Sequence, residues 1–340
     1  MSFTAFDPEA EHCGGVYPPD KDGDNASCFR HSWETAEARE LLWTTVEQEG
    51  REVKRLLLSD VNNRIRYGGY NVNGVCDPDL VTLLEEAHFR GVEVYGLYSI
   101  SDEAFTEQYR VNRLNVFNQK CGTKKAYFDG AAVNNEHFTK VKDCDGTNDA
   151  AQVAFLDNLQ AAAYAAAPLP FHFSVAWNWW CCDCSAGVER MIEWNGSWKN
   201  GLEHMIDIVD SVDVQVAWNT GSTMTRRAET AYNYWETTKK DTTASTNFYV
   251  LAYTNPNSDC RLSFSPQTKG ALTSTDDCSN GADRTEEGMF AAFDEVRASL
   301  PAAKGGIHML GGVYSSGMPG WPKHVSASAQ PQVRGGGARH

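Results

Sequence analysis

The chain has 340 residues, of which 41% are hydrophobic and 22% are charged, and its net charge is −15. This apolar content is sufficient for a large buried core, and the length suits one large barrel or two ordinary domains. An acidic surface repels phosphate backbones, so we expect no nucleic-acid partner. Basic runs and apolar stretches of about 18 residues are both missing, so we expect no membrane contact, and the oligomeric state stays open.

Ten cysteines and two Asn-x-Ser sequons indicate an oxidising compartment. The sequons are Asn25-Ala26-Ser27 and Asn195-Gly196-Ser197. We therefore expect a disulfide-bonded glycoprotein that is secreted or lies in the secretory-pathway lumen. Its first residues resemble no signal peptide, so we expect that such a signal was removed. The pair Cys260 and Cys278, which share one loop, is the first candidate for a bridge.

In chain order, amphipathic segments of helical period alternate with short β-rich runs. The expected helices are 33–50, 78–90, 103–119, 150–166, 198–210, 224–238 and 285–300. The expected strands that follow them are 53–61, 92–100, 125–135, 171–179, 212–220, 247–255 and 306–314.

Apolar strands that alternate with helices predict an α/β fold with parallel strands. A doubly wound sheet and a closed barrel both fit. Seven units and no GxGxxG loop favour a (β/α)8 TIM-type barrel with long disulfide-containing loops after its strands. The eighth strand, short or irregular, is expected within 26–30. The predicted organisation is an N-terminal segment 1–32 that can include this strand, a barrel 33–324 and a disordered tail 325–340.

The strand segment AYFDGAAVNNE, Ala126 to Glu136, is the candidate for catalysis. Asn134 and Glu136 are two residues apart, so both side chains project to one face of the strand. At the carboxyl end of a barrel strand, that face points into the mouth of the barrel. Glycoside cleavage needs an acid that protonates the leaving oxygen, and an amide beside that acid can hold a sugar substituent. We therefore expect a glycosidase pair at Asn134 and Glu136, with Asp129 at the start of the segment as a further candidate that the family resemblance below implies.

This segment resembles the catalytic motif of the family 18 and family 85 glycoside hydrolases, which are chitinases and endo-β-N-acetylglucosaminidases. The family 18 motif is Asp-Gly-x-Asp-x-Asp-x-Glu on the fourth barrel strand, and family 85 has Asn-x-Glu at its end. Asp129-Gly130 and Asn134-x-Glu136 are in register with these motifs, whereas Ala132 stands at the middle Asp. The match covers about ten residues.

The resemblance implies a retaining, substrate-assisted hydrolase of N-acetylglucosamine-containing glycans. Glu136 would be the acid/base, and Asn134 would orient the 2-acetamido group. Trp218-Asn219 stands where the chitinases often have Tyr-Asp, which implies a role in sugar binding. We expect no cofactor and no metal.

Further carbohydrate-binding candidates lie at the ends of other predicted strands. Aromatic rings can stack on sugar faces, and polar groups can bind sugar hydroxyl or acetamide groups. The candidates are Asp60, Trp177, Asn178, Trp179 and Tyr253. The two tryptophans can equally belong to the core, and Asp60 can equally cap a helix. Two alternatives to an enzyme remain open, a non-catalytic lectin-like barrel and an extracellular structural protein.

Overall fold

A computed structural model gives the fold of the chain. It describes residues 2–5, 36–48, 51–58, 61–71, 73–100, 107–135, 149–178, 181–183, 187–243, 246–253, 264 and 286–308. Among these residues, no helix combines the length and the apolar character that a membrane span requires.

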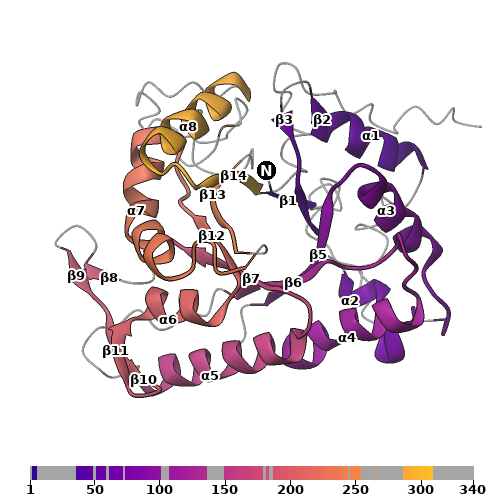
Figure 1. Ribbon diagram of the computed structural model, residues 1–340, viewed down its shortest axis with the longest axis horizontal. Coiled ribbons are helices and arrows are strands. Elements are labelled where there is room, and N and C mark those ends of the chain that lie inside the picture. Colours follow the sequence, from indigo (N-terminus) through magenta and orange to yellow (C-terminus); the bar gives the residue numbers. More distant parts are fainter. Residues whose placement is uncertain are drawn as a thin grey trace, which may run out of the picture.

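Eight parallel strands form a curled sheet at the centre of the molecule, and helices surround it (Figure 1). The hydrogen-bonded order is β1-β14-β13-β12-β7-β6-β5-β4, and β1 also pairs with β4, which closes the order into a ring. The strands are β1 (Ser2–Ala5), β4 (Arg55–Leu58), β5 (Glu93–Ile100), β6 (Gly130–Asn135), β7 (Phe171–Ala176), β12 (Ser211–Gln215), β13 (Phe248–Tyr253) and β14 (Lys304–His308).

The predicted α/β fold with a curled parallel sheet is confirmed, but the position of its first strand was wrong. That strand is β1, at residues 2–5 rather than 26–30, and it pairs with β4 and β14. The motif SFTA alternates polar and apolar residues over only four positions, which is too short to stand out from sequence alone. Residues 26–30 lie outside the described residues. With β1 in place, β6 is the fourth strand of the ring.

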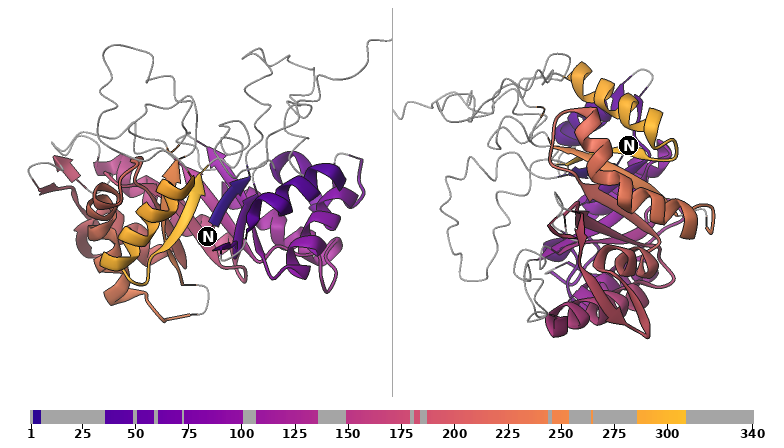
Figure 2. Two further views of the ribbon diagram at one scale, coloured as in Figure 1. Left: turned by 90° about the horizontal axis from the view of Figure 1, so that it is seen from above. Right: turned by 90° about the vertical axis from the view of Figure 1, so that its left-hand side faces the viewer.

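Each of the seven predicted helices is present, with boundaries shifted by a few residues. They are α1 (Ala36–Val46), α3 (Pro78–Phe89), α4 (Glu107–Lys120), α5 (Asp149–Ala166), α6 (Gly201–Ile208), α7 (Gly221–Thr238) and α8 (Glu286–Ser299). Short elements add to them, namely α2 (Val61–Arg64), a 3-10 turn (Tyr67–Gly69) and the hairpin of β2 (Glu47–Gln48) with β3 (Arg51–Glu52). Figure 2 shows the helices outside the strands from two further directions.

The start of α6 was predicted three residues too early, at Trp198. The segment 181–198 instead contains β8 (Cys181–Asp183), β9 (Val188–Glu189) and β10 (Met191–Trp194), and residues 197–200 form β11 (Ser197–Asn200). Asn200 then caps the helix in a capping box with Glu203, which fixes the start of α6 at Gly201.

The turn between β10 and β11 contains the sequon Asn195-Gly196-Ser197. Asn195 and Gly196 have φ values of 50° and 73°, and all three residues are exposed. Consecutive left-handed residues of the Asn-Gly type are typical of a tight two-residue hairpin turn. The folded chain therefore leaves room for a glycan at Asn195.

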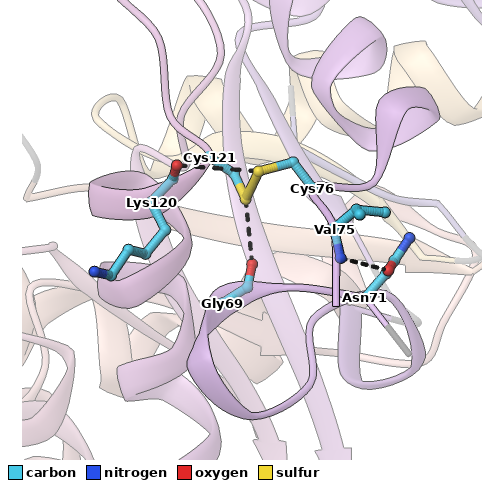
Figure 3. Close-up of a disulfide and its surroundings, with 6 residues drawn as sticks. All are labelled: Gly69, Asn71, Val75, Cys76, Lys120 and Cys121. Atoms are coloured by element: carbon cyan, nitrogen blue, oxygen red, sulfur yellow. Dashed lines mark hydrogen bonds between the residues drawn. A yellow bond between two sulfur atoms is a disulfide. The ribbon is translucent and has the colours of Figure 1, made fainter. Parts of the chain in front are cut away.

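One disulfide joins the segment before α3 to the end of α4 (Figure 3). Cys76 and Cys121 are 45 residues apart in sequence, and Sγ of Cys121 lies 3.5 Å from the carbonyl oxygen of Gly69. Cys181 and Cys182 are also disulfide-bonded, so they are not free to bind a metal. The predicted pair Cys260–Cys278 lies outside the described residues.

Candidate functional site

The inward-facing side chains of four neighbouring strands form the candidate site. Strand register places Asn134 of β6 beside Ser174 of β7, and Ser174 beside Asp213 of β12. Gln215 follows on the same face of β12, because side chains alternate along a strand. Asn134 and Gln215 lie near the carboxyl ends of their strands, which is the end where parallel barrels of this type build active sites.

Gln215 is the centre of the upper part of this site. Its Nε2 donates to Oδ1 of Asn134 at 3.0 Å and to Oγ of Ser174 at 2.9 Å. Its Oε1 accepts a hydrogen bond of 2.8 Å from the hydroxyl of Tyr253. Because Gln215 is only 5% exposed, these bonds replace water around its amide. The structure thus brings together Asn134 and Tyr253, two of the predicted site residues, through a residue that was not predicted.

Below Gln215, the polar contacts continue into the interior of the ring. Ser174 donates to Oδ1 of Asp213 at 2.5 Å, and Oδ2 of Asp213 lies 2.8 Å from Nε2 of His172. Nδ1 of His172 lies 2.8 Å from Oγ of Ser211. Ser211 also accepts a hydrogen bond of 3.0 Å from Nη1 of Arg55, on the strand opposite in the ring. A chain of hydrogen bonds therefore crosses the interior.

His172 and Arg55 are both fully buried in this chain. Burial lowers the pKa of His172, and this effect outweighs the hydrogen bond and attraction of Asp213, which act in the opposite direction. His172 is therefore neutral, and it accepts from Ser211 while it donates to Asp213. Arg55 stacks on the ring of Tyr95 at 3.9 Å and pairs with Glu93 at 2.8 Å, so its charge is compensated.

Asp129 immediately precedes β6, at the end opposite Asn134, and its side chain contacts α3 on the outside of the sheet. Its Oδ2 accepts a 2.7 Å hydrogen bond from the backbone N–H of Val94 and lies 2.9 Å from Nε2 of His88 in α3. Asn134 lies five positions further along the chain, a span of about 17 Å in a parallel strand. The structure therefore does not bring Asp129 together with Asn134, and its contacts anchor the start of β6.

The packing of Tyr95 explains the glycine of the Asp-Gly pair. A Cβ atom at Gly130 would lie 1.7 Å from an atom of the Tyr95 ring, so no larger residue fits. Ala132, on the same face of β6, packs with Tyr95, Leu57 and Leu97 in a small apolar cluster. The position that carries the middle Asp in the family 18 motif is therefore part of an apolar interior here.

Trp177 and Trp218 lie on either side of an arginine of α7. The guanidinium carbon of Arg227 is 4.3 Å from the ring centre of Trp177 and 4.6 Å from that of Trp218. Nη1 of Arg227 donates to the carbonyl oxygens of Val216 and Ala217 at 2.6 and 2.8 Å. Burial, with a smaller effect of Arg226, lowers the pKa of Arg227 to about 10. The guanidinium of Arg227 thus lies between the rings of Trp177 and Trp218.

The remaining predicted residues are only partly located. Asn178 is exposed in the turn after β7, whereas Asn219 is buried, with 2% of its surface exposed. Glu136, Asp60 and Trp179 lie outside the described residues, so their placement stays a prediction.

The residues that sequence reasoning missed are His172, Ser174, Ser211, Asp213 and Gln215. They carry a signal in the sequence, because FHFSVA and SVDVQ alternate polar and apolar residues with period two. Such alternation usually means one face in solvent. Here, both faces are buried and the polar face is the interior of the ring.

Comparison with known proteins gives only distant likenesses. No protein-family model matches the chain, and no curated protein matches it. Among solved structures, a chitinase from Bacteroides thetaiotaomicron is 13% identical over 82% of this chain and 88% of its own, with a TM-score of 0.45. The C-terminal domain of a putative chitinase from Desulfitobacterium hafniense is 11% identical over 65% of this chain, with a TM-score of 0.39. The chain spans 64% of that domain, less than two thirds of it.

Proteins of different chemistry match to a similar degree. An F420-dependent secondary alcohol dehydrogenase is 9% identical over 81% of this chain, with a TM-score of 0.42. Likenesses of this strength do not distinguish one chemistry from another, because one fold can host many activities.

Proposed function

We propose that the chain is a (β/α)8 TIM-type glycoside hydrolase that cleaves N-acetylglucosamine-containing glycans with retention of configuration. The observation that carries this proposal is the position of Asn134. It lies at the carboxyl end of the fourth strand, and its amide faces inward onto Gln215. Asn134 itself supplies no proton, and the acid that the reaction needs is Glu136, its partner in the Asn-x-Glu motif.

In this proposal, Glu136 protonates the leaving oxygen and later deprotonates water. The 2-acetamido group of the substrate attacks the anomeric carbon through its carbonyl oxygen, so the enzyme needs no carboxylate nucleophile. Asn134 holds that acetamide in line for attack. The apolar surroundings of Ala132 agree with a single carboxylic acid, because they leave no carboxylate at the middle position of the motif.

The test is hydrolysis of chitin oligosaccharides and N-glycopeptides by the wild type and by Glu136→Gln. We expect the variant to lose at least about a hundredfold in rate, the usual contribution of a positioned acid. Glu287→Gln, on the exposed face of α8, is the matched control and should keep full activity. Equal, absent turnover in the wild type and in Glu136→Gln would exclude the enzyme. Sugar binding without turnover would support a lectin-like barrel instead.

We also propose that the chain matures in the secretory pathway and carries a glycan at Asn195. The disulfide Cys76–Cys121 and the exposed turn at Asn195 support this proposal. Secretory expression in a eukaryotic host should yield a product whose mass falls after treatment with a peptide-N-glycosidase. The Asn195→Gln variant should lose one glycan unit, and an unchanged mass would contradict occupancy of this sequon.

A further inference from the structure

The hydrogen bonds inside the ring have only one consistent direction. The carboxylate of Asp213 can only accept hydrogen bonds. Ser174 therefore donates its single hydroxyl proton to Oδ1 of Asp213. Oγ of Ser174 is then an acceptor towards Gln215, at 2.9 Å. The neighbour at that distance has to be a donor, which identifies it as Nε2 of Gln215 and fixes the orientation of this amide.

The orientation of Gln215 in turn fixes Asn134. Nε2 of Gln215 has a second proton, and this proton is directed to the side chain of Asn134 at 3.0 Å. The atom of Asn134 that receives it must be the carbonyl Oδ1. The remaining oxygen of Gln215 accepts the proton of Tyr253 at 2.8 Å, so both ends of the Gln215 amide agree with this assignment.

This arrangement determines which atom of Asn134 is left for a ligand. Its Oδ1 is engaged by Gln215, whereas its Nδ2 makes no hydrogen bond to any of the described residues. Asn134 is only partly buried, while Gln215 and Ser174 are each 5% exposed and Asp213 is fully buried. The series of hydrogen bonds from Asp213 through Ser174 and Gln215 thus ends at the amide of Asn134, whose Nδ2 protons are not bonded within the described residues.

We propose that Gln215 is a positioning residue that presents Asn134 as a hydrogen-bond donor, and that this selects sugars whose 2-substituent carries an acceptor oxygen. The inference rests on the proposed function and adds to it the residue that orients Asn134 towards the 2-substituent. A 2-acetamido group offers a carbonyl oxygen to Nδ2 of Asn134. A 2-ammonium group offers only N–H donors, which an N–H donor repels. The site therefore favours N-acetylated oligosaccharides over their deacetylated counterparts.

The test compares binding of chitin tetramer and of its fully deacetylated form, measured by calorimetry. In the wild type, we expect the acetylated tetramer to bind at least about tenfold more tightly, which corresponds to one hydrogen bond. Gln215→Met removes the bond to Asn134 and should abolish this preference. Gln215→Glu offers acceptors only, which should turn Nδ2 of Asn134 inwards and favour the deacetylated tetramer. Gln119→Met and Gln119→Glu, on the exposed end of α4, are matched controls that should behave as the wild type.

A second readout follows the Asn134 amide without any sugar. In protein labelled with ¹⁵N-asparagine, the side-chain signal that Asn134→Asp removes is that of Asn134. We expect Gln215→Met to shift it and Gln119→Met to leave it in place. Tyr253→Phe, a milder change that frees Oε1 of Gln215, should shift it less.

The outcomes separate the two proposals. Folded Gln215 variants that keep both the wild-type Asn134 signal and the wild-type sugar preference would overturn the positioning role. If the wild type binds neither tetramer, the proposed function and the sugar selectivity fail together. A shifted Asn134 signal in Gln215→Met would then still support the positioning role by itself.

Discussion

The interior of the strand ring has two halves that are held in different ways. On the side of β4, β5 and β6, the side chains of Leu57, Tyr95, Leu97 and Ala132 fill most of the space by shape, and Arg55 of β4 reaches across to Ser211. On the side of β7 and β12, the interior positions are His172, Ser174, Ser211, Asp213 and Gln215, which fill it by hydrogen bonds. Apolar contacts have no direction, whereas each hydrogen bond assigns a donor and an acceptor. Only the polar half can therefore transmit an orientation to Asn134.

The largest test of this difference is the removal of Asp213. Asp213→Ala leaves His172 and Ser174 buried without their acceptor, and we expect a loss of about 3–5 kcal/mol in the free energy of unfolding. Asp294→Ala, in an exposed pair with Arg297 on α8, should cost less than about 1 kcal/mol. Urea denaturation measures both. Equal losses would mean that the buried hydrogen bonds of Asp213 stabilise the fold no more than the exposed ion pair does.

In the apolar half, the corresponding change is Gly130→Ala. The new methyl group overlaps the Tyr95 ring, so we expect a loss of about 2–3 kcal/mol from overpacking. Replacing Tyr95 with leucine removes the overlap, so Gly130→Ala should cost clearly less in that background. A double-mutant cycle by denaturation measures this coupling. Additive costs would contradict the assignment of Gly130 to the Tyr95 contact.

A pH titration distinguishes the buried histidine from one at the outer rim. Burial lowers the pKa of His172 in the folded state. Below pH 6.5, the imidazole of His172 is therefore protonated in the unfolded state before it is protonated in the folded state. This group therefore lowers the free energy of unfolding as the pH falls below 6.5, by up to about 1.4 kcal/mol per pH unit.

His88 should show the opposite sign. Burial lowers its pKa, but the hydrogen bonds to Asp129 and to the carbonyl oxygen of Lys125 raise it more, so its net pKa is raised. The stability it contributes is complete below pH 6.5 and is lost as the pH rises through the folded pKa. NMR titration of the imidazole signals should place His88 above 6.5 and His172 below. The reverse order would contradict both assignments.

The smallest expected effect concerns the last bond of the polar half. Tyr253→Phe removes the hydrogen bond to Oε1 of Gln215, so we expect a loss of about 1 kcal/mol in stability. Tyr127→Phe, at an exposed ring that stacks on His88, should change stability by no more than about 0.5 kcal/mol. Thermal denaturation compares the two. A neutral Tyr253→Phe would indicate that the hydrogen bonds to Ser174 and Asn134 are sufficient to hold Gln215.

Much of the fold could be predicted from the sequence, because helix–strand alternation is a local signal. The helix over 78–90 is an example, since Asp77 and Pro78 define its start as α3. The strand β1 was missed because its four residues are held by partners that are distant in the sequence. The hairpin after Trp194 was missed although Asn195-Gly196 is a local turn signal. At the candidate site, Asn134 was identified from its motif, whereas Gln215 was not, since a lone glutamine in a strand has no distinctive spacing.

The sequence by itself determined most of the order of helices and strands and the residues that alternate along β6. These follow from the local periods of apolar and polar residues. Only the tertiary structure decided that Asp129 faces α3, that Trp177 and Trp218 enclose Arg227, and that hydrogen bonds link Asp213 to Asn134 through Ser174 and Gln215. The physical reason is that hydrogen-bond direction depends on partners from several strands, which meet only when the sheet curls.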